Sequence, residues 1–560
     1  AISYKMYDAV EMLINKDTNI NTTNKNGITP LYIAIQNGEQ KIVEKIIDKI
    51  GINIVDGVKN TPLHMAVKTN QAEIMQMLFN RGAIVHINAE NGNNETPLYL
   101  AINNRNEEIA KILINNGASI DFVDKYSNAT LLHLASMGNL SEIAQILINK
   151  GANINARTIS GFTSLYFAIV NNAEKTAEIL INNGAKVDFV DENNNTLLHL
   201  AIFAKLEKIA QMLIDNGVEI DTENNNGKTP LHLAFELGSK KIVATLIKKN
   251  AKINFVDKDN NTPLHLAAER GWLGIVQMLI KKDVMLDYID YINQYKETPL
   301  HVAIINNYIA VAKILIKNGA RGDTVDDGHD TALHLAIVYK LDDIAKMLIN
   351  MDVKFDSRDK NGQTPLGVAI MKGNQEIANM LLNKGARIDT VDYNNNTLLH
   401  LASTSGLKEI AQILIDEWPK EHIDVVNNFK STPLHNAAYA GHPEIAQMLI
   451  DNGANINATN DNKDTPLHLA VFNNKQEIVA ILIVNRANIN AQNEDGDTPL
   501  HLAIYNKEIV QMLVNAPGVN VNIRNNAGET PLDIAKRLCQ NAIVEIITNS
   551  PAYTGIAATT

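Results

Sequence analysis

A short phrase that returns at a nearly constant interval constrains this chain more than any other feature. Its commonest form is Thr-Pro-Leu-His-x-Ala, and its threonine occurs 16 times, 32 to 36 residues apart and most often 33. A period of this length predicts a solenoid, in which each unit packs only against its neighbours. The 560 residues therefore do not indicate three or four globular domains. The repeated threonines are Thr29, Thr61, Thr96, Thr130, Thr163, Thr196, Thr229, Thr262, Thr298, Thr331, Thr364, Thr397, Thr432, Thr465, Thr498 and Thr530.

The unit that begins at Thr465 predicts two short helices and a turn. Proline follows the threonine, at the first helical turn, where its missing N–H costs nothing. Apolar residues recur at helical spacing at Leu467, Ala470 and Val471, and again across residues 478–483 after an Asn-Asn break. Residues 487–490 then lead into Asn, Asp and Gly, which suit a tight hairpin. Each unit is thus predicted to be a helix, a turn, a second helix and a hairpin loop.

Sixteen such units resemble the ankyrin-repeat family. The resemblance implies an all-α repeat fold, a solenoid of stacked helix-turn-helix units with β-hairpin loops and a groove lined by loops and first helices. Residues 29–549 are expected to form sixteen repeats, residues 1–28 a partial repeat and residues 550–560 a flexible tail. The partial repeat indicates a shortened first helix or, in the preferred interpretation, a cut from a longer protein.

Histidine is the residue type that first suggests chemistry here, because eleven of the fifteen belong to the repeated phrase. A metal or catalytic site needs its ligands in one place, whereas these histidines recur once per repeat. The family resemblance implies that they hydrogen-bond backbone groups between neighbouring units. We therefore expect no catalytic, cofactor or metal site and no enzyme. The eleven are His64, His133, His199, His232, His265, His301, His334, His400, His435, His468 and His501.

Other motifs and the composition exclude further classes. The Gly-Lys-Thr at 227–229 lacks the earlier glycine of a phosphate loop, and Asp257–Asn261 lacks the glycine of a calcium loop. Cys539 is the single cysteine and is expected to be a buried or inert thiol in the final helices. A net charge of −12 with scattered Lys and Arg indicates no nucleic-acid partner, and no run approaches the roughly 20 apolar residues of a membrane span. A cytoplasmic monomer is expected.

One position per repeat predicts where a partner protein would bind. It is the second residue after the phrase's alanine, on the groove side of the first helix, and it is mostly apolar from Val170 onward. Exposed apolar and aromatic side chains are typical of interfaces, although they could instead pack against adjacent repeats. The predicted partner-binding residues there are Val170, Phe203, Ile305, Val338, Met371, Tyr439, Phe472 and Tyr505, and a second patch is predicted at Tyr288, Tyr291 and Tyr295 in a longer unit.

The leading functional prediction is a protein–protein interaction scaffold. Abundant Asn, Ile and Lys make the chain similar to long ankyrin proteins of intracellular bacteria and large viruses. The resemblance favours a host-directed effector, or its binding region, that binds a host protein in the host cytosol after secretion. Two alternatives stay open: the targeting arm of a larger toxin or enzyme whose catalytic domain lies outside this chain, and a structural spacer.

Overall fold

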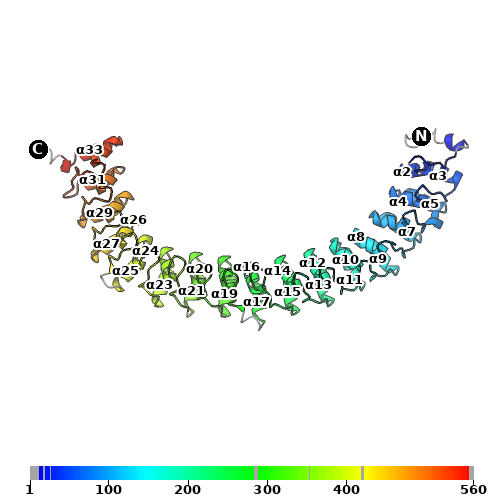
Figure 1. Ribbon diagram of the computed structural model, residues 1–560, viewed down its shortest axis with the longest axis horizontal. Coiled ribbons are helices and arrows are strands. Elements are labelled where there is room, and N and C mark those ends of the chain that lie inside the picture. The colour runs from blue at the N-terminus through cyan, green and yellow to red at the C-terminus, as the bar shows by residue number, and fades with distance from the viewer. Residues whose placement is uncertain are drawn as a thin grey trace. The chain divides into compact units, whose positions relative to one another are not determined.

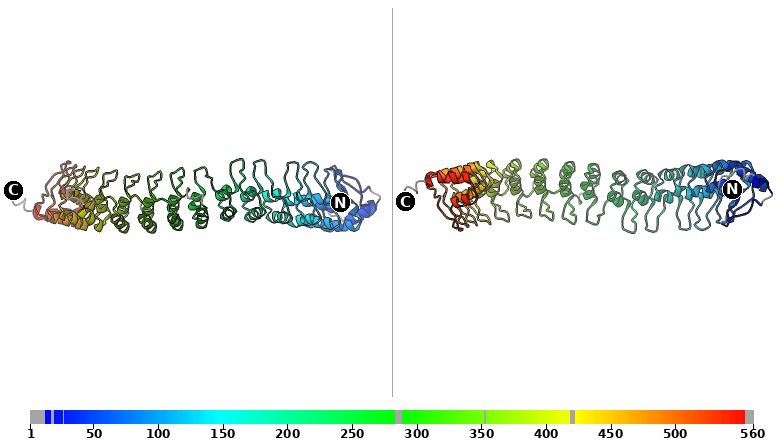
Figure 2. Two further views of the ribbon diagram at one scale, coloured as in Figure 1. Left: turned by 90° about the horizontal axis from the view of Figure 1, so that it is seen from below. Right: turned by 90° about the horizontal axis from the view of Figure 1, so that it is seen from above.

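The computed structural model describes residues 12–16, 19–25, 27–282, 288–351, 353–417 and 422–553. The chain divides into two compact units, residues 1–255 and residues 256–560. In each unit the first helices of the repeats stack along one edge and the second helices along the opposite edge (Figure 1). The loops that join one repeat to the next, here called fingers, project sideways from these helices (Figure 2). The predicted all-α repeat solenoid is confirmed.

Among the residues that the structure describes, the first unit contains seven helix pairs. Their first helices are α2 (Pro30–Gln36), α4 (Pro62–Lys68), α6 (Pro97–Asn103), α8 (Leu131–Gly138), α10 (Ser164–Val170), α12 (Leu197–Phe203) and α14 (Pro230–Glu236). The second helices are α3 (Gln40–Ile50), α5 (Ala72–Asn80), α7 (Glu107–Asn115), α9 (Ser141–Asn149), α11 (Glu174–Asn182), α13 (Glu207–Asp215) and α15 (Lys240–Lys248).

The described part of the second unit contains nine further pairs. Their first helices are α16 (Pro263–Glu269), α18 (Pro299–Ile305), α20 (Ala332–Val338), α22 (Pro365–Met371), α24 (Leu398–Ser405), α26 (Pro433–Ala440), α28 (Pro466–Phe472), α30 (Pro499–Leu502) and α32 (Pro531–Arg537). The second helices are α17 (Leu273–Ile280), α19 (Ile309–Lys317), α21 (Asp342–Ile349), α23 (Gln375–Asn383), α25 (Lys408–Glu417), α27 (Pro443–Asp451), α29 (Gln476–Val484), α31 (Lys507–Val514) and α33 (Asn541–Thr548).

The repeated threonine sets the start of each first helix. Its backbone is extended and its hydroxyl oxygen accepts a hydrogen bond from the amide three residues later, as at Thr96, where Tyr99 N donates at 3.1 Å. An N-cap of this kind satisfies an amide that has no partner within the helix. The cap works without proline, since α10 still begins directly after Thr163, with Tyr166 N donating at 3.2 Å.

The core of each repeat is a small set of apolar side chains facing the neighbouring repeats. In the unit that begins at Thr465, Leu467 and Ala470 of α28 and Ile478 and Leu482 of α29 are all at most 1% exposed. Alanine at the centre of the first helix lets helices approach closely, and each buried leucine contributes about 2 kcal/mol. Helical periodicity in the sequence therefore identified the core correctly.

The fingers are closed by side chains rather than by regular strands. In the finger before α24, Asp392 N donates to the Asn396 carbonyl at 3.1 Å, and the Asp392 carboxylate accepts from the amides of Asn394 and Asn396 at 2.9 and 2.8 Å. Asn395 then adopts a left-handed φ of 61°. Such Asx turns explain the Asn, Asp and Gly of the predicted hairpins. Within the described ranges the fingers form isolated bridges, such as Val391 with Thr397, and no strand.

Successive fingers also bond to one another through their backbones. Tyr393 N donates to the Asn361 carbonyl of the preceding finger at 2.9 Å, and Glu494 N donates to the Asn462 carbonyl at 2.8 Å. The donor lies four residues before one repeated threonine and the acceptor three residues before the previous one. The same register recurs in the first unit, where Ile159 N donates to Ser127. We refer to this row of bonds as the finger ladder.

The ends and the longer units depart from the regular pattern. The extra residues of the unit after Thr61 form the short 3-10 helix η2 (Ala83–His86), directly after the second helix α5. Cys539 is exposed, with a φ of 54°, in the turn between α32 and α33, so of the two expected alternatives, a buried or an inert thiol, the buried one is excluded. Ser550 is buried and residues 551–553 are helical, whereas residues 1–11 and 554–560 lie outside the described ranges.

Candidate partner-binding surface

The repeated threonine and histidine form one hydrogen-bonded frame. In the unit of Thr397, the threonine amide donates to His400 Nδ1 at 3.2 Å, and His400 N donates to the threonine hydroxyl at 3.4 Å. His400 Nε2 lies 2.9 Å from the carbonyl oxygen of Ser431, in the next finger. Nine of the eleven repeated histidines reach a finger carbonyl through Nε2 in this way. The bond between neighbouring units that the family resemblance implies is confirmed.

The frame also fixes the protonation state of these histidines. Because a backbone N–H always donates, Nδ1 must be the unprotonated nitrogen, so the proton sits on Nε2, and in nine of the eleven it points to the finger carbonyl. Burial lowers the pKa of all eleven below the usual 6.5, and lowers the pKa of His265 and His400 to about 4. These histidines therefore stabilise the stack in the neutral form.

Comparison with known proteins identifies the family to which a chain with this repeated frame belongs. The model of the family described as "Ankyrin repeats (3 copies)" matches residues 1–91, 84–158, 120–191, 165–257, 205–290, 249–326, 288–359, 333–425, 399–493 and 467–556. This chain belongs to the ankyrin-repeat family. Ankyrin repeats bind other proteins, so the chain is a protein–protein interaction scaffold.

Two curated relatives match short parts of this ankyrin-repeat chain. An ankyrin repeat protein of fowlpox virus (strain NVSL) is 36% identical over 89 residues, which are 16% of this chain and 21% of the viral protein. The human transient receptor potential cation channel subfamily A member 1 is 28% identical over 85 residues, 15% of this chain and 8% of the channel. The chain thus matches only a small part of either relative, and the first supports its similarity to viral ankyrin proteins.

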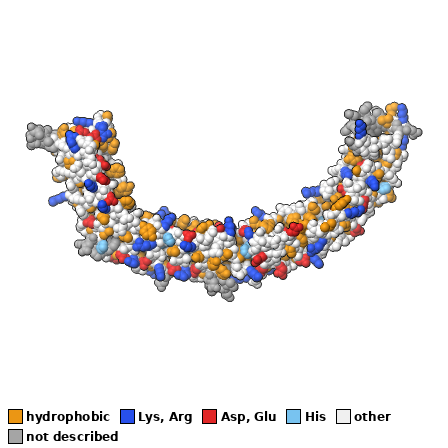
Figure 3. Space-filling view, viewed as in Figure 1, with side chains coloured by type: hydrophobic (Ala, Val, Ile, Leu, Met, Phe, Trp, Pro, Cys, Tyr) orange, Lys and Arg blue, Asp and Glu red, His pale blue; other side chains and the backbone are white. Residues whose placement is uncertain are grey.

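We call the predicted partner-binding residues at the ends of the first helices the stripe. These residues lie on the first-helix edge of the solenoid. Val170 and Phe203 are exposed in the first unit, as are Val338 and Met371 in the second, and Ile305 is half-buried. Exposure is greatest in three consecutive repeats of the second unit, at 57% for Tyr439, 67% for Phe472 and 73% for Tyr505. Figure 3 shows hydrophobic side chains along this edge of the second unit. Binding by the stripe remains a prediction.

The three tyrosines of the predicted second patch fall in two places. The rings of Tyr288 and Tyr291 are half-buried and lie against one another at an interplanar angle of 32°, with their centroids 5.7 Å apart. The Tyr291 hydroxyl donates to Asn260 of the preceding finger at 3.4 Å. Tyr295 lies at the finger tip and is exposed. Tyr288 and Tyr291 therefore pack neighbouring loops together, and only Tyr295 extends from the tip.

A row of residues that sequence reasoning missed runs beside the stripe. It is formed by the residue just before each repeated threonine, here called the flanking position. Lys228 at this position pairs with Glu236 at the stripe position at 2.6 Å, and Glu529 pairs with Arg537 at 2.7 Å. Equivalent contacts join Asn60 to Lys68 and Gln363 to Met371. The flanking residue recurs with the same period as the phrase, but its type varies, so only the structure reveals which side chain it accompanies.

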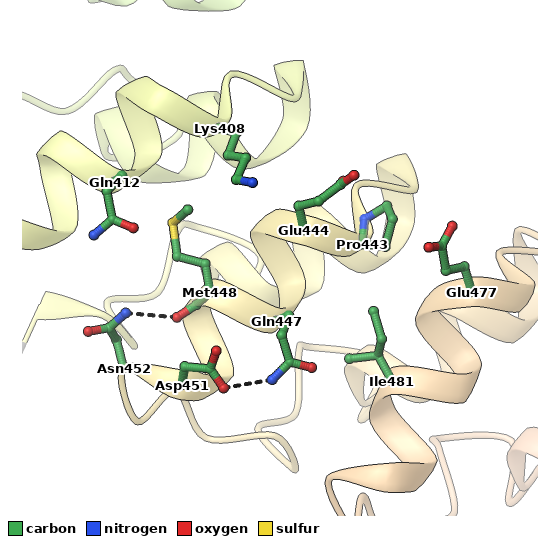
Figure 4. Close-up of a pocket in the computed structure, with 10 residues that line it drawn as sticks. All are labelled: Lys408, Gln412, Pro443, Glu444, Gln447, Met448, Asp451, Asn452, Glu477 and Ile481. Atoms are coloured by element: carbon green, nitrogen blue, oxygen red, sulfur yellow. Dashed lines mark hydrogen bonds between the residues drawn. The ribbon is translucent and has the colours of Figure 1, made fainter.

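A depression of about 440 Å³ lies on the second-helix edge, between α25, α27 and α29 (Figure 4). Its polar groups are partly bonded to one another, since Gln447 donates to Asp451 at 2.6 Å and Asn452 donates to the Met448 carbonyl at 2.9 Å. It is lined by Lys408, Gln412, Pro443, Glu444, Gln447, Met448, Asp451, Asn452, Glu477 and Ile481, and it contains no nucleophile paired with a base.

Two searches over the part of the chain that the structure describes concern other kinds of site. No group of three or more His, Cys, Asp or Glu side chains there is arranged to hold a metal ion. No described helix has both the length and the apolar composition needed to cross a bilayer.

Proposed function

We propose that this ankyrin-repeat scaffold is a host-directed effector, or the binding region of one, that holds a host protein against its first-helix edge. The observation that carries the proposal is the exposure of Tyr439, Phe472 and Tyr505 at one register position in three consecutive repeats. The apolar positions of the same helices, such as Leu467 and Ala470, are fully buried, so the exposed rings add nothing to the core.

The energetics of these rings favour a partner. Covering one ring contributes roughly 2 kcal/mol, and aromatic side chains are prominent among the residues that dominate binding energy. The three rings occupy one register position in consecutive repeats and so lie along one edge, where a single partner could cover them. A structural spacer, by contrast, would need no exposed aromatic residue at this position.

The direction toward a host rests on two further observations. The chain is similar to an ankyrin repeat protein of fowlpox virus, and its composition is rich in Asn, Ile and Lys. The proposal therefore places the scaffold in the host cytosol after secretion, with a host protein as its partner. A targeting arm of a larger toxin would use the same edge, and the full reading frame of the gene distinguishes it from a free-standing effector.

A capture experiment with matched variants tests the proposal. The wild-type chain is used to capture proteins from a host-cell lysate, beside a variant with Tyr439→Glu and Phe472→Glu and a control with Val484→Glu. Val484 is 79% exposed at the end of the second helix α29, so it is an equally accessible apolar residue on the other edge. We expect the stripe variant to lose the captured protein, the control to keep it, and all three to melt at the same temperature.

Two outcomes would contradict the proposal. If the stripe variant melts at a clearly lower temperature, the rings belong to the core. If it stays folded and captures the same protein as the wild type, the first-helix edge is not the binding surface.

A further inference from the structure

In the last repeats of the second unit, the flanking positions beside the exposed rings are acidic. Asp464 directly precedes Thr465 and so accompanies Phe472, and Asp497 directly precedes Thr498 and so accompanies Tyr505. This assignment follows from the register in which Glu529 contacts Arg537 and Lys228 contacts Glu236. Two successive repeats thus each present a carboxylate and an aromatic face on the same edge.

Hydrogen bonds hold the two carboxylates in place, and each carboxylate still has an oxygen that can accept a hydrogen bond from a cation. Asn493 Nδ2 donates to Asp464 Oδ1 at 3.0 Å, and Asn525 Nδ2 donates to Asp497 Oδ1 at 2.8 Å. Both aspartates are half-buried, and no lysine or arginine among the residues that the structure describes forms an ion pair with either of them. The second oxygen of each carboxylate therefore remains available as an acceptor.

Nearby lysines do not neutralise this pair of sites. Lys430 is paired with Asp461 at 3.0 Å, and Lys507 with Glu508 at 3.7 Å. Lys475 lies over Gly441, in the turn that follows Tyr439. Tyr439 itself is accompanied by the neutral Ser431, so its repeat has the ring without the carboxylate.

We propose that Asp464 with Phe472, and Asp497 with Tyr505, recognise two arginine side chains of a partner's basic segment. An exposed ring attracts a cation to its face, and a guanidinium can stack on the ring while its planar fork donates to a carboxylate. Lysine offers a more strongly hydrated point charge and cannot make the same paired contact. The chemistry of both sites therefore selects guanidinium, and this inference rests on the proposed use of the first-helix edge.

The repeat spacing sets the spacing of the two arginines. Packed helices lie roughly 8 to 10 Å apart, so equivalent sites on successive first helices are separated by about that distance. A polyproline II segment advances about 3.1 Å per residue with three residues per turn, so side chains three residues apart lie on one face and bridge the gap. The expected partner segment adopts this conformation and carries the pattern Arg-x-x-Arg, with neutral or basic residues between the arginines.

Peptide binding to the full chain tests this inference. The probes are fluorescein-labelled peptides with Arg-x-x-Arg in a Gly-Ser background, and the same peptides with lysine, citrulline or glutamate in place of arginine. Fluorescence anisotropy should show the arginine peptide binding at least about tenfold more tightly than the citrulline peptide, several-fold more tightly than the lysine peptide, and no binding of the glutamate peptide. Added salt should weaken the arginine complex.

Matched variants assign the binding to the two sites. Asp464→Asn with Asp497→Asn keeps the acceptors for the two asparagines but removes the charge, and we expect at least about tenfold weaker arginine binding at an unchanged melting temperature. Phe472→Leu keeps an apolar side chain but removes the aromatic face, and should also weaken it. Glu477→Gln, an exposed acid on the second helix α29, should change nothing.

Equal binding of the arginine and citrulline peptides, absence of arginine-peptide binding, or full binding by the double Asp→Asn variant would overturn the inference. The capture experiment separates this result from the proposed function. If the Tyr439→Glu and Phe472→Glu variant loses its captured protein while no arginine peptide binds the wild type, the edge binds a partner of different chemistry. If the arginine peptide binds as expected but the captured protein remains on that variant, the proposed function fails.

Discussion

Acidification should destabilise this chain through its repeated histidines well before its carboxylates are protonated. In the folded chain the neutral ring is required, because Nδ1 accepts the amide of the repeated threonine, as at Thr397 with His400. The unfolded chain has no such restriction and binds protons below about pH 6.5. A folded-state pKa below the unfolded value means that the stabilisation is complete above pH 6.5 and is lost as the pH falls toward 4.

The magnitude follows from the two histidines whose pKa is lowered furthest. With a pKa of about 4 in the folded chain, His265 and His400 each lose about 2 kcal/mol of stability between pH 7 and pH 5. Together they remove about 4 kcal/mol from the part of the chain that contains both, a large share of ordinary domain stability. The other nine act in the same direction. Asp330 opposes them, because burial and the nearby Asp326 and Asp359 raise its pKa to about 6, so its protonation favours the folded chain.

Urea denaturation followed by circular dichroism at pH 7, 6 and 5, at constant ionic strength, measures the effect. The midpoint should fall at each step, and unfolding at pH 5 should take up about two protons from these two residues alone. As a control, Leu414→Ala removes a fully buried apolar side chain and no titrating group, so it should lower the midpoint at each pH and leave the pH dependence unchanged. A constant midpoint from pH 7 to pH 5, or a His400→Gln variant whose curve runs parallel to the wild type, would refute the reasoning.

Three further changes have effects that the structure specifies. Leu414→Ala removes a fully buried side chain and should cost about 3 kcal/mol in urea denaturation, whereas Phe472→Ala should leave stability nearly unchanged. Gly362→Ala puts a Cβ 2.9 Å from Tyr393 N at a φ of +81°, and should cost roughly 1 to 3 kcal/mol and speed amide exchange in the finger ladder. Thr397→Ala removes an N-cap hydroxyl and should lower stability by about 1 kcal/mol; an unchanged urea midpoint would show that the cap is dispensable.

The fold could be predicted from sequence because the residues that determine the helices and turns of each repeat lie within that repeat. Threonine caps the helix even where proline is absent, as before Ser164, and apolar residues at helical spacing, such as Ile478 and Leu482, face the neighbouring repeats. The finger turns follow from Asp or Asn five residues before the threonine. These signals lie within one period, so they need no knowledge of contacts distant in sequence.

The candidate surface was less accessible to sequence reasoning. Helical geometry predicts that the stripe is exposed. The flanking residue that contacts each stripe residue, however, lies eight residues earlier in the sequence, before the turn that leads into the helix. The sequence pattern therefore did not indicate that Asp464 and Asp497 lie beside aromatic residues of the stripe. The three tyrosines of the longer unit were grouped because they are close in sequence. Tyr288 packs against Tyr291, which bonds to the preceding finger, however, and Tyr295 lies at a finger tip, so the patch divides.

The finger ladder gives the junctions at which it forms the same pair of connectors, a donor facing back and an acceptor facing forward. Removing or duplicating a whole period there joins a donor such as Tyr393 N to an acceptor equivalent to the one it left. A change in length by whole repeats at these junctions therefore leaves the ladder bond intact. Extra residues that are not a full period need a place outside this register, and the structure shows one at Ala83–His86, after a second helix. The ladder thus allows the number of repeats to vary while the geometry of each junction is preserved.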